Sequence, residues 1–69
     1  MKISARNQIK GKITNIKDGA VNAIVVLDIG GGNKISATIS MDAVKELDLK
    51  IGMDAYAIIK ATSVMMGID

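Results

Sequence analysis

The chain of 69 residues contains no cysteine, no histidine and no proline, and Tyr56 is its single aromatic residue. Without cysteine or histidine it has neither disulfides nor the usual zinc ligands, and it lacks the common enzymatic nucleophiles and bases. No pair of carboxylates stands out as an acid/base couple either, so we expect no enzymatic activity. One aromatic residue and no basic stripe also argue against nucleic-acid binding, which relies on stacking platforms.

Long hydrophobic runs are absent too. The longest uninterrupted apolar runs, residues 23–27 and 55–59, are five residues each, far too short to cross a membrane. No apolar signal region opens the sequence. The lack of cysteine agrees with a reducing compartment. We therefore expect a cytoplasmic protein with no membrane partner.

What the chain does have is a large share of apolar residues, 49%, with a net charge of only +2. A domain of this size buries only about 60% of the surface that its unfolded chain exposes. So much apolar surface is difficult to hide in a solitary small domain, and disulfides and metals are not available to support it. The composition therefore predicts a homo-oligomer.

Apolar residues alternate with polar ones between glycine breaks, which predicts strands. We expect a long first strand with a bulge or bend at Gly11, a hairpin turn at residues 17–19 and a second strand over 20–29. A glycine-rich loop at residues 30–33 precedes a third strand over 34–40. Ser40 is the predicted cap of a short helix over 41–47, followed by strands over 55–60 and 64–66. This order predicts an all-β fold, a single five-stranded OB-like barrel over residues 1–69 with one short helix.

Two polar stretches at opposite ends of the chain are rich in hydrogen-bond donors and free of carboxylates. They are Ser4-Ala5-Arg6-Asn7-Gln8 and Lys60-Ala61-Thr62-Ser63. A tetrahedral dianion needs convergent donors of this kind: hydroxyls, backbone N–H groups and one or two cations. A lining of donors alone suits an oxyanion that carries no proton at neutral pH. Composition alone favours the simpler interpretation of these stretches as polar faces of edge strands.

Three segments resemble the Mop family of small molybdate-binding proteins, also called molbindins. They are residues 4–11 (SARNQIKG), 31–35 (GGNKI) and 60–65 (KATSVM), and the helix region over 40–47 (SMDAVKEL) resembles the same family. The resemblance implies an OB-like fold, assembly into a hexamer built as a trimer of dimers, and oxyanion sites at subunit interfaces. It also implies non-enzymatic binding of molybdate or tungstate, as ligand and not as catalytic cofactor, for storage, buffering or homeostasis.

Carried over to this sequence, the resemblance implies a site with two walls. One wall is Ser4, Ala5, Arg6 and Asn7, and the other is Lys60, Ala61, Thr62 and Ser63. Arg6 or Lys60 would supply charge, Thr62 and Ser63 hydroxyls, and the Ala5 and Ala61 positions backbone N–H groups. A second type of site is expected at residues 16–19 or around Ser40.

Two other functions stay open: binding of the molybdopterin cofactor itself, and an oxyanion-sensing module whose occupancy alters assembly. The sequence does not distinguish molybdate from tungstate. The remaining features have simpler interpretations. Residues 30–32 lack the Lys-Ser/Thr that ends a P-loop, and Met53, Met65 and Met66 are interpreted as core residues. Asp42, Glu46 and Asp48 are interpreted as a solvated helix face, with no metal site.

Overall fold

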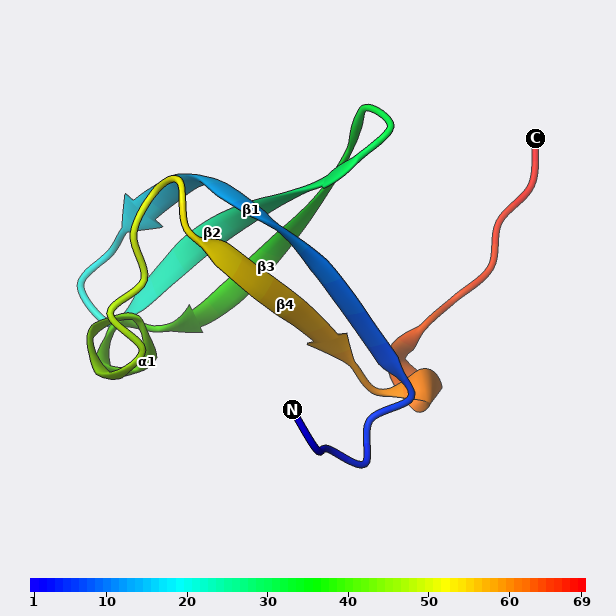
Figure 1. Ribbon diagram of the computed structural model, residues 1–69, viewed down its shortest axis with the longest axis horizontal. Coiled ribbons are helices and arrows are strands. Elements are labelled where there is room, and N and C mark those ends of the chain that lie inside the picture. Colours follow the sequence, from blue (N-terminus) through cyan, green and yellow to red (C-terminus); the bar gives the residue numbers. More distant parts are fainter.

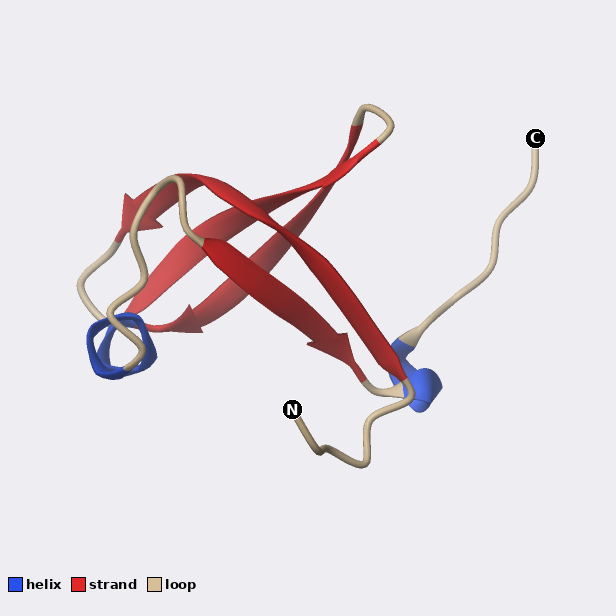
Figure 2. Ribbon diagram, in the orientation of Figure 1, coloured by secondary structure: helices blue, strands red, loops and turns tan.

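A computed structural model describes all of residues 1–69. It contains one antiparallel sheet of four strands in the order β3-β2-β1-β4, strongly curled into a half-barrel (Figure 1). Figure 2 shows the same chain by element type, with strands dominating and two short helical segments at opposite ends of the sheet. The elements are β1 (Asn7–Asp18), β2 (Asn22–Gly30), β3 (Asn33–Ser40), α1 (Met41–Glu46), β4 (Asp54–Ile59) and the 3-10 turn η1 (Ala61–Ser63).

Strand β1 pairs with both β2 and β4 and is the centre of the fold. Its bulge lies between Ile13 and Asn15, so the prediction of a bulge or bend at Gly11 was wrong. Gly11 pairs in register with Ala55. The glycine is needed there for a different reason: a Cβ at this position would lie 2.5 Å from the Asp28 carbonyl oxygen and 2.8 Å from Leu27 Cγ. Gly11 thus permits a close approach of two curled strands.

The β2–β3 hairpin confirms the predicted glycine-rich turn. Gly30 pairs with Asn33, and the two residues between them, Gly31 and Gly32, have φ values of 63° and 81°. Two consecutive positive φ values are those of the tight turn that matches the right-handed twist of a hairpin, and glycine adopts them without steric cost.

Helix α1 lies at one end of the half-barrel (Figure 1). Ser40 caps it as predicted, because its hydroxyl accepts a 3.0 Å hydrogen bond from the Ala43 N–H. Val44 is the buried residue of the helix and joins the core formed by Ile13, Ala23, Val25 and Leu27. The helix ends one residue earlier than predicted, at Glu46, with Leu47 as its C-cap.

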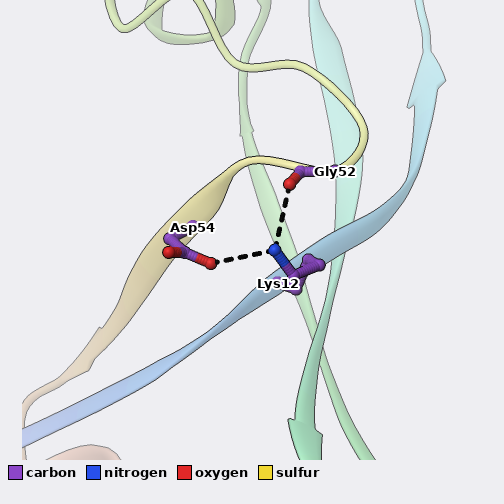
Figure 3. A network of polar contacts seen from close by, with 3 residues as sticks. All are labelled: Lys12, Gly52 and Asp54. Atoms are coloured by element: carbon purple, nitrogen blue, oxygen red, sulfur yellow. Dashed lines mark hydrogen bonds and ion pairs between the residues drawn. The ribbon is translucent and has the colours of Figure 1, made fainter.

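The segment between α1 and β4 is fastened to β1. Ile13 N–H donates to the Met53 carbonyl at 2.9 Å, and Gly52 N–H donates to the Ile13 carbonyl at 2.8 Å. The Lys12 ammonium lies 3.2 Å from Asp54 Oδ1 and donates to the Gly52 carbonyl, also at 3.2 Å (Figure 3). These contacts set the start of β4 beside the middle of β1.

Only five of the 69 residues are buried, which makes the core of one chain very small. Strands β3 and β4 are the two edges of the sheet, and each pairs on one side only. An open apolar groove with a volume of about 420 Å³ runs along the inside of the half-barrel; of its 15 lining residues, only Asp54 is polar. The single chain therefore leaves much of its apolar interior uncovered.

The predicted five-stranded barrel was right in its curled, mostly β architecture and wrong in its strand count. Residues 64–66 are not a fifth strand of this sheet: after η1 the chain leaves the domain (Figure 1). Met65 and Met66 are 91% and 93% exposed and Met53 is 37% exposed, so the interpretation of these methionines as core residues was also wrong for the single chain. Tyr56, in the predicted strand over 55–60, is half exposed. Neither helical segment has the length and hydrophobicity of a membrane-spanning helix.

Candidate functional site

The two donor-rich stretches, at opposite ends of the sequence, meet at one end of the sheet. The start of β1 pairs with the end of β4, with Asn7 opposite Ile59. The Asn7 side chain reinforces this pairing, since its Nδ2 donates to the Ile59 carbonyl at 3.2 Å. The residues before β1 and those after β4 consequently lie side by side, which the alternation pattern alone did not show.

A pocket of about 420 Å³ lies between these two stretches. Six of the eight predicted site residues line it, together with two isoleucines that the sequence reasoning missed. The lining residues are Ile3, Ser4, Ala5, Arg6, Ile58, Lys60, Ala61 and Thr62. The missed isoleucines give the pocket an apolar flank. Ile3 directly precedes the first polar stretch, but nothing in the sequence marks Ile58, whose contribution depends on the strand register.

The other two predicted residues, Asn7 and Ser63, do not line the pocket. Asn7 clamps β1 to β4 through the hydrogen bond to Ile59 described above. Ser63 closes η1, in which its N–H donates to the Lys60 carbonyl at 2.9 Å. Both residues thus stabilise backbone next to the pocket without lining it.

Backbone donors are free along both walls. The N–H groups of Ala61 and Thr62 donate no hydrogen bond within the chain, because the bonds of η1 begin with Ser63 and Val64. The N–H groups of Ser4, Ala5 and Arg6, which precede β1, have no backbone partner either. Free N–H groups in residues that line a small hollow can form the backbone component of an anion site.

The charges around the pocket have one sign. Arg6 and Lys60 are the charged residues of the lining, and no carboxylate is among them. Neither cation takes part in the two ion pairs of the chain, Lys12–Asp54 and Lys50–Asp48. Two uncompensated cations, the hydroxyls of Ser4 and Thr62 and the free N–H groups make a small donor-rich pocket without a carboxylate, open to solvent. Its chemistry fits a small anion without protons of its own.

A smaller hollow of about 260 Å³ lies at residues 17–19, part of the segment where a second type of site was predicted. Its lining includes Lys17, Asp18 and Gly19 from the predicted segment, with Thr38 from β3. Ser40 does not line it and instead caps α1. The Asp18 carboxylate makes this hollow less suited to an anion than the pocket between the termini. No group of three or more His, Cys, Asp or Glu side chains gathers anywhere in residues 1–69 in a way that could hold a metal ion.

Comparison with known proteins places the chain in a family. The TOBE-domain family model matches residues 3–66, and the probable molybdenum-pterin-binding protein of Haemophilus influenzae is 67% identical over the full length of both chains. The chain belongs to the Mop family of TOBE-domain proteins. Among solved structures, MopII from Clostridium pasteurianum is 52% identical and superposes with a TM-score of 0.91, covering 97% of this chain and all of that one.

A second solved structure is a complex with an oxyanion. The cytoplasmic molybdate-binding protein ModG, crystallised with molybdate bound, is 43% identical, with a TM-score of 0.93. The match covers all of this chain and 49% of ModG. The predicted family is therefore confirmed, and the curled, mostly β sheet is consistent with the predicted OB-like fold.

Proposed function

We propose that this protein binds molybdate, or the similar tungstate, in the pocket between residues 3–6 and 58–62. The observation that carries the proposal is the donor-rich lining: Arg6 and Lys60 without a carboxylate, beside two hydroxyls and free N–H groups. Molybdate is a tetrahedral dianion without a proton at neutral pH, and every polar side chain of this lining can donate to it. The molybdate-bound relative ModG supports the choice of oxyanion.

The expected affinity follows from the number of donors. A charge-assisted hydrogen bond contributes about 1.5–3 kcal/mol, and four or five of them, less the cost of ordering, give roughly the 8 kcal/mol of micromolar binding. Isothermal titration with molybdate, tungstate, sulfate and hydrogen phosphate tests this. We expect micromolar binding of the first two and weaker binding of hydrogen phosphate, because the lining has no carboxylate to accept its proton and only the two hydroxyls as side-chain acceptors. No heat with molybdate would overturn the proposal, as would equal binding of phosphate.

The proposal extends to the assembly and the role. With five buried residues and an exposed apolar groove, the chain is expected to form a homo-oligomer, and the hexamer built as a trimer of dimers is the form that we propose. The pocket would then lie at a subunit interface. We further propose a non-catalytic cytoplasmic role in storing or buffering the oxyanion, with one TOBE domain per chain.

Two alternatives lead to different measurements. Relatives named molybdenum-pterin-binding proteins favour a pterin ligand, but no aromatic residue lines the pocket to stack on a pterin ring. Retention of a pterin chromophore by the protein purified from its host would support that alternative. A sensing role would instead make the mass of the assembly depend on added molybdate, because a ligand that binds the assembled form stabilises it by mass action.

A further inference from the structure

The turn between β1 and β2 carries the dipeptide Asp18-Gly19, at the end of the sheet near α1 and away from η1 (Figure 1). Asp18 is the last residue of β1 and pairs with Ala23 of β2. Among residues 19–21, the only backbone hydrogen bond is the one that the Val21 carbonyl accepts from Met41 N–H at 2.8 Å. The turn is exposed and has no internal hydrogen bond, so its backbone changes conformation easily.

An Asp-Gly bond in such a turn can rearrange without an enzyme. The main-chain nitrogen of the glycine attacks the side-chain carboxyl carbon of the aspartic acid. The carboxyl OH and the N–H proton leave as water, and a five-membered succinimide forms. Water then opens the ring: cleavage at the side-chain carbonyl restores aspartate, whereas cleavage at the main-chain carbonyl leaves the chain running through the β-carbon as isoaspartate. Glycine permits this attack best, because it has no Cβ to obstruct it and reaches backbone angles that other residues avoid.

Both reacting groups are free at Asp18-Gly19. The Asp18 carboxylate takes part in neither ion pair and accepts no hydrogen bond. The Gly19 N–H donates no hydrogen bond within the chain. Attack therefore breaks no hydrogen bond or ion pair of either group. A Cβ at position 19 would overlap the Asn22 carbonyl oxygen, so the turn requires the same glycine that makes it reactive.

The other internal aspartates differ from Asp18 in two ways. None of them is followed by glycine. In each, either the carboxylate or the N–H of the following residue is already engaged, so attack must first break a contact. These contacts are Asp28 Oδ1 with Gly30 N–H at 2.9 Å, Ala43 N–H after Asp42 with the Ser40 hydroxyl at 3.0 Å, Leu49 N–H after Asp48 with the Val44 carbonyl at 3.0 Å, and Asp54 Oδ1 with the Lys12 ammonium at 3.2 Å.

We propose that Asp18-Gly19 is a site of spontaneous modification, at which isoaspartate accumulates through a succinimide. Isoaspartate adds one carbon to the main chain between Asp18 and Gly19, so the pair of Asp18 with Ala23 that ends the β1–β2 ladder is lost. The free carboxylate also moves, and with it the lining of the hollow that Asp18 shares with Lys17 and Thr38. Asp18 and Gly19 do not line the oxyanion pocket, so the proposal stands or falls independently of molybdate binding.

Ageing of the full-length chain at neutral pH and physiological temperature tests the proposal. Samples taken over several weeks are labelled with an isoaspartate-specific methyltransferase and S-adenosylmethionine, and the modified position is found by electron-transfer mass spectrometry of the digested chain. We expect isoaspartate to form at position 18 about tenfold faster or more than at any other aspartate, which corresponds to a barrier lower by about 1.4 kcal/mol. No isoaspartate at position 18, or equal accumulation at another aspartate, overturns the proposal.

Two variants at the same position complete the test. Asp18→Glu keeps the charge, but its longer side chain would have to close a six-membered ring, so we expect the label at this turn to disappear. Asp18→Asn passes through the same succinimide with ammonia as the leaving group, and we expect it to lose its amide and form isoaspartate faster than the parent. Undiminished labelling of the Asp18→Glu chain would place the modification elsewhere. An Asp18→Asn chain that keeps its amide would show that the turn holds the side chain out of reach of the Gly19 nitrogen, and either result contradicts the proposal.

Discussion

Substitution of Lys60 is the sharpest probe of the proposed oxyanion site. The backbone of Lys60 holds η1 through its carbonyl, which accepts from Ser63 N–H. Lys60→Ala removes the ammonium and keeps that carbonyl, so the turn is expected to survive. A unit cation and a dianion about 4 Å apart attract by roughly 2 kcal/mol in water. The typical value of about 1.5–3 kcal/mol for one charge-assisted hydrogen bond agrees with this figure.

A loss of about 2 kcal/mol corresponds to a roughly 30-fold rise in the dissociation constant. Isothermal titration with molybdate at constant ionic strength measures it. Lys34→Ala is the matched control, because it removes the same charge at the β2–β3 hairpin, away from the pocket. We expect less than a twofold change for the control. If the dissociation constant of Lys60→Ala stays within about threefold of the parent's, the pocket is misplaced. If the control loses as much affinity as Lys60→Ala, the effect is only that of net charge.

Three further predictions concern stability. Ile13 is 1% exposed and is the largest fully buried side chain. Ile13→Ala should lower the free energy of unfolding by about 2–5 kcal/mol, measured by urea denaturation at fixed protein concentration. A loss of less than about 1 kcal/mol would contradict its place in the core. Ser40→Ala should cost about 1 kcal/mol and Ser40→Asp close to nothing, because only the first removes the cap of α1. Lys12→Ala should lower the free energy of unfolding by less than about 1 kcal/mol, measured by thermal unfolding, because both partners of its ion pair are more than half exposed. A larger loss would mean that the hydrogen bond from Lys12 to the Gly52 carbonyl also stabilises the fold.

The elements that sequence reasoning predicted well are those with a partner inside one chain. Ala23, Val25 and Leu27 alternate along β2, and all three are buried as the pattern requires. Ser40 was recognised as a cap because it precedes the apolar periodicity of a short helix. Local chemistry and alternation are sufficient to predict these elements, because the spacing of apolar residues in the sequence shows which face of the strand or helix is buried.

The errors have a common cause, the difference between an apolar residue and a buried one. Residues 64–66 have the composition of a strand, and Met65 and Met66 that of core residues, yet in the single chain they pair with neither edge of the sheet. Gly11 was assigned to a bulge because glycine often marks one, whereas its function is to let β1 approach Asp28 and Leu27 of β2. Curvature and close approach depend on pairs of strands and are not visible in either strand alone.

The candidate site shows both the strength and the limit of sequence reasoning. Donor-rich composition and resemblance selected Ser4, Arg6, Lys60 and Thr62, and the fold brings these four into one pocket. The register that sets Asn7 opposite Ile59 makes the two ends of the chain neighbours, and that register could not be read from either segment. It also explains why Ile58 was missed.

Diffraction from crystals grown with molybdate, collected at the molybdenum absorption edge, tests the central claim most directly. The heaviest atoms of the chain itself are the sulfurs of its five methionines, which scatter only weakly at that wavelength. The account predicts an anomalous peak in the pocket, with oxygens within hydrogen-bond distance of Lys60 or Arg6 and of the free N–H groups of Ala5 or Ala61. A peak confined to other surfaces of the protein, or no peak at saturating molybdate, would contradict it.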